Sequence, residues 1–337
     1  HKNNVQDSQG TFCICSTNDI HRRYCMNRLP WQNGLGQKIN ALCEIFPAVI
    51  RDRWQERVRY NAEKIATYEG SAQVTEDILW RSVYEVFPGG YEPLILKVKD
   101  PARLKADMIA SREQEHLEPG DEPVKLTRWL KTSVTDAAIS HGKKILAVNS
   151  SKRKGGNTDI IIDMLVKACV DNGSEVEKFY LGDLNIKPCT GCRACRKADV
   201  KTICTVKDDM TEFMYDKIFG MDGFIMGFPI YTARENGIMA NFMDRWDCFA
   251  NPFLTRKMPG LKKGLVVCSW MCPNQTAYDN IVENMVILLR LHGVETTDVL
   301  VVTGTRGKQH GKGVVKNHPD ILQTAYHAGE DFLRTLS

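Results

Sequence analysis

The sequence of 337 residues has no long hydrophobic run and no strong excess of charge of either sign. No apolar stretch approaches the roughly 20 residues of a membrane-spanning helix, and no secretory signal peptide is visible. The formal net charge is +4, which gives no electrostatic reason to expect a nucleic acid as partner. With 43% hydrophobic and 26% charged residues, the composition is that of an ordinary globular protein, which we expect in the cytoplasm.

Two nucleotide-binding fingerprints are also missing from the chain. Neither G-x-G-x-x-G, typical of dinucleotide folds, nor G-x-x-x-x-G-K-[ST], typical of nucleoside triphosphatases, is present. Cysteine, in contrast, is abundant, with 12 residues. Without a secretory signal, cysteines are more often metal-binding or catalytic than disulfide-bonded.

The most informative motif is a run of cysteines with the spacing C-x2-C-x2-C, followed after eight residues by one more. Thiolates two residues apart can surround one inorganic centre, and four thiolates satisfy a four-iron four-sulfur (4Fe-4S) cluster. Zinc, an alternative, usually takes two separated C-x2-C pairs, and unrelated buried thiols have no reason for regular spacing. The predicted cluster ligands are Cys189, Cys192, Cys195 and Cys204.

Other cysteines allow two weaker hypotheses. Cysteines near the N-terminus could bind a second cluster, although their irregular spacing leaves incidental thiols as the alternative. These are Cys13, Cys15, Cys25 and Cys43. Cys268 and Cys272 could form a redox-active dithiol beside a cofactor, with buried inert thiols as the alternative.

Changes in composition and hydrophobic pattern divide the chain into four parts. Residues 1–29 form a cysteine-containing arm, residues 30–95 a small helical domain, residues 96–140 a charged linker, and residues 141–337 an α/β domain. In the second part, apolar residues at helical spacing predict helices over 39–46, 48–68 and 78–86, the last capped by Thr75. The linker should contain one helix around 101–116 and pack on the α/β domain or on a neighbouring subunit.

The helical part resembles the small domain at the C-terminus of a subunit of light-independent protochlorophyllide reductase, which is also found on anaerobic redox proteins. The similar residues are Ile39-Asn40-Ala41-Leu42, Phe46-Pro47-Ala48-Val49-Ile50-Arg51, Glu63-Lys64-Ile65-Ala66, Gly70 and Val74-Thr75-Glu76-Asp77. This resemblance covers about fifty residues and carries no catalytic residue. It implies a redox context rather than chlorophyll synthesis.

After residue 141, short apolar strands alternate with amphipathic helices. Strands are predicted over 144–148, 176–181, 223–228, 264–268 and 299–302, and helices over 159–170, 276–291 and 321–336. Such alternation predicts a parallel sheet with right-handed crossovers. Five strands in fewer than about 200 residues fit a flavodoxin-like doubly wound domain.

In this fold the loops after the strands meet at one edge of the sheet, where ligands bind. The loop over 149–158 combines hydroxyls, a cation and glycines directly before a helix, whose N-terminal N–H groups favour an anion. This suits a terminal monophosphate such as that of FMN, with an ordinary polar turn as the alternative. No second, adenosine-binding fingerprint is present, which favours FMN over FAD. The candidate residues from these loops include Ser150, Ser151, Arg153, Gly155, Asn157, Thr158, Ser269 and Trp270.

Four stretches together resemble the iron–sulfur flavoproteins, in the NADPH-dependent FMN reductase group of flavodoxin-like proteins. They are Ser151-Lys152-Arg153-Lys154-Gly155-Gly156-Asn157-Thr158, the cysteine run with Asp208-Asp209-Met210, Pro229-Ile230-Tyr231, and Asn241-Phe242-Met243-Asp244-Arg245. The resemblance covers residues 143–337. Ser150 replaces a usual glycine, and Ala240 replaces a frequent lysine.

The resemblance implies roles for individual residues. Ser151, Arg153, Asn157 and Thr158 would hold the FMN phosphate, and the four cysteines of the run would ligate a 4Fe-4S cluster. The residues along the isoalloxazine ring would be Pro229, Ile230, Tyr231 and Thr232. It also implies a homo-oligomer in which the cluster of one subunit approaches the flavin of its neighbour.

Several further side chains have two interpretations each. Tyr231 could stack on the flavin or be a structural tyrosine. Asp244 and Arg245 could be a catalytic pair, but a structural ion pair at an interface is favoured, because Phe242, Met243 and Trp246 beside them resemble an interface core. His292 and His327 are interpreted as surface or core residues.

The sequence therefore predicts an FMN- and iron–sulfur-containing oxidoreductase that passes electrons between its cluster, its flavin and a small acceptor or redox partner. A ferredoxin-like protein is the expected donor. Two alternatives remain: an NAD(P)H-dependent FMN reductase of a small substrate such as a quinone, and a non-enzymatic cluster-based sensor or docking factor. The substrate is not specified by any motif.

Overall fold

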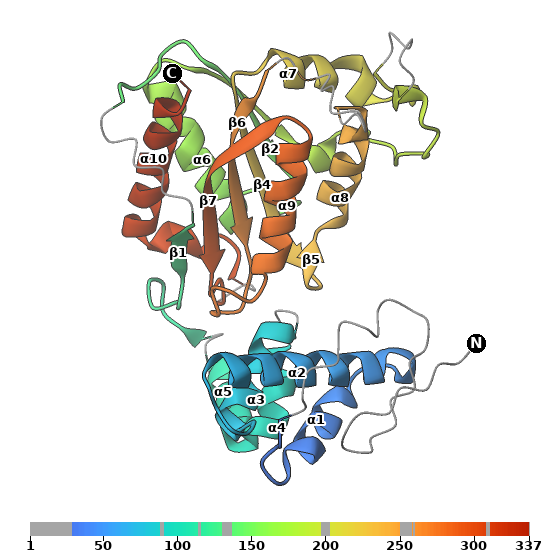
Figure 1. Cartoon of the computed structure of the whole chain (residues 1–337). Helices are drawn as coiled ribbons and strands as arrows, with labels where there is room; N and C mark the ends of the chain where they lie inside the picture. The colour runs from blue at the N-terminus through green and yellow to red at the C-terminus, as the bar shows by residue number, and fades with distance from the viewer. Residues whose placement is uncertain are drawn as a thin grey trace, which may run out of the picture. The chain divides into compact units, whose positions relative to one another are not determined.

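A computed structural model describes residues 29–87, 91–113, 116–129, 137–196, 203–249, 258, 260–307 and 311–336. The chain forms two compact units, His1–Lys105 and Ala106–Ser337 (Figure 1). In the described part of the chain, no helix is both long and apolar enough to cross a membrane. The predicted second-cluster ligands Cys13, Cys15 and Cys25 lie outside the described residues.

The first unit is helical. Its helices are α1 (Leu35–Cys43), α2 (Ala48–Tyr68), α3 (Glu76–Val86), α4 (Glu92–Lys99) and the start of α5 (Pro101–Glu113). The hydroxyl of Thr75 accepts a hydrogen bond from the backbone N–H of Ile78, so Thr75 caps α3 as predicted. Cys43 is fully buried among the apolar side chains of this unit, and burial raises the pKa of its thiol to about 11. Cys43 therefore packs as a small core residue.

The second unit is built on a sheet with the strand order β1-β7-β6-β4-β2-β3. The strands are β1 (Lys125–Arg128), β2 (Lys144–Asn149), β3 (Glu175–Tyr180), β4 (Gly223–Tyr231), β5 (Arg234–Glu235), β6 (Lys262–Ser269) and β7 (Val294–Thr303). The parallel strands β3-β2-β4-β6-β7 have the order 2-1-3-4-5, which is that of flavodoxin-like domains. The predicted five-stranded parallel sheet is confirmed.

Two antiparallel strands extend this sheet beyond the prediction. β5 forms a short hairpin with β4, and β1 pairs with β7 at the edge, with Leu126 opposite Val302. β1 comes from the segment predicted to be a linker. Arg128 fixes it by ion pairs with Asp298 and Asp331, which come from β7 and from the last helix. A strand of only four residues, flanked by charged side chains, is too short for its alternation to be recognised.

Helices cover both faces of the sheet (Figure 1). α6 (Asn157–Asp171) and α10 (Pro319–Arg334) pack together on one face, over apolar side chains from β2, β4, β6 and β7. The other face packs against α7 (Tyr215–Gly220), α8 (Gly237–Asp244) and α9 (Asp279–Leu291). Shorter helical segments are Leu181–Asp183, Ala194–Arg196, Met210–Met214, Arg245–Phe249 and Val314–Asn317.

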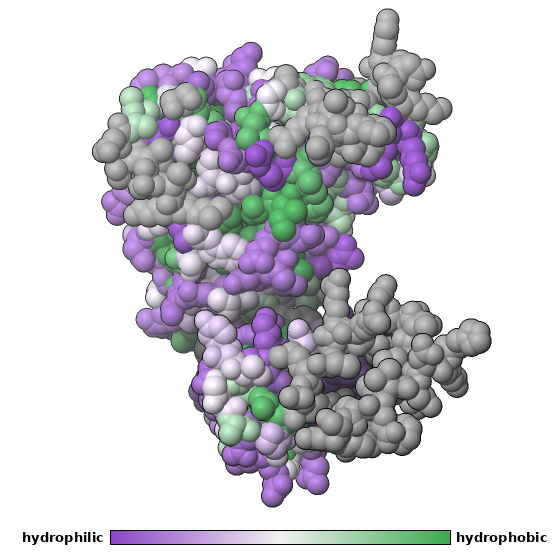
Figure 2. Space-filling view, in the orientation of Figure 1, coloured by the Kyte–Doolittle hydropathy of each residue, from purple (hydrophilic) through white to green (hydrophobic). Residues whose placement is uncertain are grey.

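The predicted interface core around Asn241–Trp246 is wrong. Phe242 and Trp246 are fully buried and Met243 is nearly so, and all three pack in the core of their own chain beneath the sheet. The sequence alone does not distinguish this arrangement, because cores and interfaces use the same side chains. The exposed apolar side chains lie elsewhere, for example Ile287 and Leu291 on α9, where Figure 2 shows apolar surface.

Candidate functional site

A cavity of about 330 Å³ lies where the parallel strands end at their carboxyl edge. It is lined by Ser151, Arg153, Gly156, Asn157, Thr158, Pro229, Ile230, Tyr231, Ser269, Trp270, Met271, Thr305 and Lys312. Most of the residues predicted to bind a cofactor are therefore brought together. Ser150, Gly155 and Thr232 do not line the cavity, whereas Gly156, Met271, Thr305 and Lys312 line it without having been predicted.

The loop between β2 and α6 presents backbone donors to this cavity. α6 is 15 residues long, and its N-cap residue Gly156 supplies no side-chain acceptor. The N–H groups of the first helical turn have no intrahelical partners and lie at the positive end of the helix dipole. Gly156 also has little room for a side chain, because an added Cβ would meet the carbonyl oxygen of Arg153 at 2.7 Å.

The carboxylate of Asp159 stabilises this loop through hydrogen bonds. It accepts hydrogen bonds from the backbone N–H of Gly155 at 2.7 Å and from the Asn149 side chain at 2.9 Å. It also pairs with Lys178, whose Nζ lies 2.6 Å away, and accepts from the Tyr180 hydroxyl at 3.1 Å. Burial raises the pKa of Asp159, but the hydrogen bonds from Lys178 and Gly155 outweigh it, so the net pKa is lowered. No motif in the sequence marks Asp159 for this role.

Two of the residues predicted to bind the cofactor also make hydrogen bonds within the protein. The Asn157 side chain donates to the carbonyl of Gly311 at 2.6 Å and accepts from the backbone N–H of Val315 at 3.2 Å. It thereby fastens the loop after β7 beside the phosphate loop, which brings Lys312 to the cavity. The backbone of Ser150 is bonded to Gly227 and to the Asn236 side chain. The cations that line the cavity are then Arg153 and Lys312.

A strained turn directly follows Tyr231, which lines the cavity. Thr232 and Ala233, between the paired residues Tyr231 and Arg234, have φ values of 51° and 57°. Two positive φ angles in a two-residue hairpin suit a type I′ turn, which normally uses Asn or Gly. Strain of this kind costs about 1–3 kcal/mol per residue and concentrates at functional sites. The turn leaves Tyr231 43% exposed beside the cavity.

Trp270 is fixed beneath the next loop. Its side chain is 3% exposed, its indole N–H donates to the carbonyl of Asn274 at 2.8 Å, and its ring meets Tyr278 edge-on. Ser269 and Thr158 share a hydrogen bond of 2.7 Å between their hydroxyls. The hydrogen bond between Ser269 and Thr158 joins the end of β6 to the start of α6. The wall of the cavity is therefore pre-formed, except for Met271, which is 58% exposed.

The cysteine run lies in the loop after β3. Cys189 and Cys192 are exposed, and Cys195 and Cys204 are half-buried. Hydrogen bonds from the backbone N–H of Ala194, and then from the hydroxyls of Thr205 and Thr190, lower the pKa of Cys192 to about 7. Backbone and hydroxyl donors around a thiol favour the thiolate, the form that ligates iron.

The donor set therefore fits an iron–sulfur cluster in its chemistry. In the described ranges, no group of three His, Cys, Asp or Glu side chains lies close enough together to hold a metal ion. Residues 197–202, within the run, are outside those ranges. A cluster would draw the four thiols together from their positions here.

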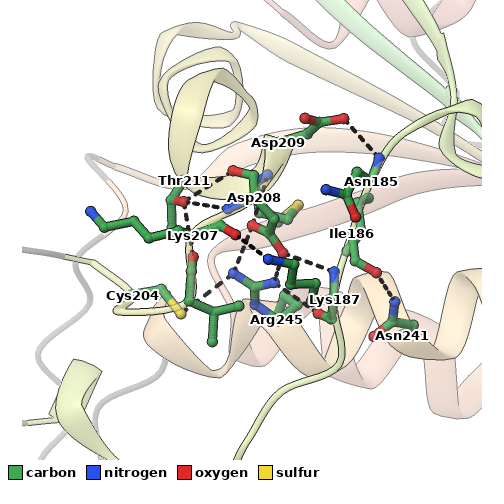
Figure 3. A network of polar contacts seen from close by, with 12 residues as sticks. Asn185, Ile186, Lys187, Cys204, Lys207, Asp208, Asp209, Thr211, Asn241 and Arg245 are labelled. Atoms are coloured by element: carbon green, nitrogen blue, oxygen red, sulfur yellow. Dashed lines mark hydrogen bonds and ion pairs between the residues drawn. The ribbon is translucent and has the colours of Figure 1, made fainter.

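The base of the cysteine loop is held by a buried ion pair (Figure 3). Arg245 pairs with Asp208, and both side chains are fully buried. Arg245 and Asp244 are consecutive and do not face one another, so the predicted pair between them is wrong. The pairing with Asp208, 37 positions away, could not be read from local spacing.

The remaining candidates are structural in this arrangement. Cys268 is fully buried within β6, and burial raises the pKa of its thiol, which argues against a reactive dithiol with Cys272. His292 is 8% exposed and contacts the Trp246 ring, and burial lowers its pKa. His327 lies at the surface of α10 and pairs with Glu330. His292 is therefore a core residue and His327 a surface residue, in agreement with the prediction.

Comparison with known proteins places this site in a family context. Residues 143–305 match the sequence model of the NADPH-dependent FMN reductases. An iron-sulfur flavoprotein from Archaeoglobus fulgidus is 35% identical over 102 residues, 30% of this chain and 48% of that protein. One from Methanocaldococcus jannaschii is 26% identical over 187 residues, 56% of this chain and 94% of that protein.

The chain spans about half the length of the Archaeoglobus fulgidus protein and of an iron-sulfur flavoprotein from Methanosarcina thermophila. Among solved structures, an NAD(P)H:quinone oxidoreductase from Methanothermobacter marburgensis aligns with a TM-score of 0.42 at 15% identity. That alignment covers 56% of this chain and 94% of the other.

Proposed function

We propose that this chain, whose residues 143–305 match the sequence model of the NADPH-dependent FMN reductases, is an oxidoreductase that binds FMN in the cavity at the sheet edge and a 4Fe-4S cluster at its cysteine run. Bound FMN supplies two-electron chemistry and a cluster supplies one-electron chemistry, so together they connect donors and acceptors of both kinds. The expected outside partners are a ferredoxin-like donor and a small acceptor.

The observation that carries the FMN proposal is the uncapped N-terminus of α6 opening into the cavity. Its free N–H groups, the Ser151 hydroxyl and the cations Arg153 and Lys312 are suited to a phosphate dianion. The nearby carboxylate of Asp159 does not oppose this, because its charge is paired with Lys178 on the far side of the loop. Pro229, Ile230, Tyr231 and Trp270 would then line the isoalloxazine ring.

The cluster proposal rests on the spacing of Cys189, Cys192, Cys195 and Cys204. The relatives named iron-sulfur flavoproteins support it. The four thiolates would hold the irons, and the hydrogen bonds to Cys192 would stabilise its negative charge.

A phosphate-specific binding experiment tests the FMN site. We expect Arg153→Gln to weaken FMN binding about ten- to a hundredfold, because one charged hydrogen bond contributes about 1.5–3 kcal/mol. Riboflavin, which lacks the phosphate, should bind the variant and the wild type equally well. The matched control is Lys154→Gln in the same loop, because Lys154 pairs with Asp183 and does not line the cavity.

Equal losses for FMN and riboflavin, or no loss for either, would contradict the assignment of Arg153. Fluorescence titration of the flavin gives all of these dissociation constants. Flavin released by acid from the purified protein should chromatograph as FMN, and release of FAD would overturn the choice of cofactor.

A direct NAD(P)H-dependent reductase is the second candidate. The exposure of Tyr231 and Met271 at the cavity rim favours it, because it leaves an approach from solvent to the predicted flavin. NADPH oxidation in the presence of a quinone, without any protein partner, would support this candidate. Turnover only with a reduced ferredoxin would favour the first.

We also propose a homo-oligomer, as the family resemblance implies. Since Phe242, Met243 and Trp246 are buried within the chain, they do not supply its interface. The exposed apolar side chains of α9, Ile287 and Leu291, are the candidates in their place.

A further inference from the structure

The cysteine loop is closed at its base by contacts between its two ends. The backbone N–H of Asn185 donates to the Asp209 carboxylate at 2.7 Å, and the backbone N–H of Asp209 donates to the Asn185 carbonyl at 3.2 Å. Closer to the cysteines along the chain, the backbone N–H of Lys187 donates to the Asp208 carboxylate at 2.8 Å (Figure 3). The segments before and after the cysteines are therefore fastened together.

Arg245 reaches this base from the end of α8 and contacts both segments. Its Nη1 donates to the carbonyl of Lys187 at 2.8 Å and pairs with the carboxylate of Asp208. The same carboxylate accepts from the backbone N–H of Met210 at 3.2 Å. Both charged side chains are fully buried, so water does not screen them. The carbonyl of Arg245 is itself held by the Tyr215 hydroxyl at 2.8 Å.

The third contact of this guanidinium is with sulfur. Nη2 of Arg245 lies 3.5 Å from Sγ of Cys204, the cysteine furthest along the run (Figure 3). The Nε of Arg245 is buried and has no hydrogen-bond partner among the described residues. A guanidinium stays positively charged under all ordinary conditions, so a permanent cation faces this thiol.

We propose that Arg245 is a positioning residue for the cluster: it fixes Cys204 at the base of the loop and raises the reduction potential by placing a buried positive charge against its sulfur. This inference rests on the proposed cluster. Each reduction adds one negative charge, and a nearby buried cation stabilises the reduced form more than the oxidised one. Hydrogen bonds to the sulfurs and net charge are known determinants of cluster potentials.

Two variants distinguish the effect of the positive charge of Arg245 from the effect of its planar guanidinium group. Arg245→Gln removes the cation, and Arg245→Lys retains it without the planar fork. The matched control is Arg196→Gln, because Arg196 directly follows Cys195 but pairs with Asp247 at the surface, where both side chains are 40% exposed. A further variant, Arg245→Gln with Asp208→Asn, leaves no buried carboxylate without a partner and guards against failure to fold.

Three quantities are measured on each anaerobically purified protein: iron and sulfide per chain, the midpoint potential of the cluster followed by EPR, and FMN content as a check of folding. For Arg245→Gln we expect the equilibrium of one-electron reduction to shift about tenfold toward the oxidised cluster, which is about 59 mV. The double variant should shift in the same direction by a smaller amount, because it also removes the buried negative charge of Asp208. Arg245→Lys and Arg196→Gln should each shift less than about threefold, the latter because exposed charges are screened.

Loss of iron from Arg245→Gln with FMN retained, and its recovery in Arg245→Lys, would support the positioning of Cys204. A fully loaded Arg245→Gln variant, or a loaded double variant, with the wild-type potential would overturn the inference and leave the proposed function intact. A wild-type protein that binds FMN but no iron would overturn the proposed cluster, and this inference with it.

Discussion

Replacement of Asp159 by Asn tests how the phosphate loop is held. The buried carboxylate of Asp159 receives hydrogen bonds from four groups: the Gly155 N–H, the Asn149 amide, Lys178 and Tyr180. Asparagine offers a single acceptor oxygen and turns an NH2 group toward donors. At least one donor therefore loses its partner, and the ion pair with Lys178 is lost.

The expected loss is about 2–4 kcal/mol in the free energy of unfolding, since hydrogen bonds to charged groups contribute about 1.5–3 kcal/mol each. Lys178 keeps Asp163 as a partner, which limits the loss. For a unit of this size, we expect the melting temperature to fall by about 5–10 °C. The matched control is Asp163→Asn, the other carboxylate on the same lysine. Because Asp163 is 56% exposed, its loss should cost less than about 1 kcal/mol.

The pH dependence has a defined sign. The pKa of Asp159 is lowered in the folded protein, so its contribution is complete above the unfolded pKa of about 3.9 and is lost as the pH falls through the lower folded value. The difference between wild type and Asp159→Asn should be constant from about pH 5 to 8 and should shrink below about pH 4. Urea unfolding at several pH values measures it. Equal effects of Asp159→Asn and Asp163→Asn would refute the reasoning.

Three further predictions follow from other parts of the molecule. Gly227→Ala should destabilise the protein by about 1–3 kcal/mol in urea unfolding, because its Cβ would lie 2.3 Å from Cδ1 of the buried Ile162. The control Gly237→Ala, which has open space around it, should be neutral. Equal stabilities of the two variants would count against the packing described. Cys192→Ser should lose the broad visible absorption of the cluster and keep FMN, and full iron content in this variant would exclude Cys192 as a ligand. Light scattering should give a mass above that of one chain, and a monomer at working concentration would refute the proposed oligomer.

The parallel sheet could be predicted from the sequence because its signals are local. Each buried strand is a short apolar run, and each crossover helix has its own periodicity, so the predicted limits of α6 and β2 lie within two residues of the observed ones. β1 was missed because it has only four residues and gains its stability from β7 and from the ion pairs of Arg128. The turn at Thr232 and Ala233 was missed as well, because neither residue favours a positive φ.

The candidate site was predictable where it follows strand ends and not where it depends on distant partners. Arg153 lies in the loop after β2 and Tyr231 is the last residue of β4, so topology brings them to one edge. Lys312 lies beside the cavity in a loop that Asn157 holds through Gly311 and Val315, more than 150 positions away in the sequence. The hydrogen bonds that fix Asp159 and Arg245 cross from one loop or strand to another, and no local pattern records them.

The most direct test of the central claim is the cofactor content of the wild-type chain purified without oxygen. Iron, acid-labile sulfide and acid-released flavin are measured on the same sample and divided by the protein concentration. We expect about four irons, about four sulfides and one FMN per chain. A chain that carries FMN with no sulfide, or with a single zinc in place of iron, would contradict it.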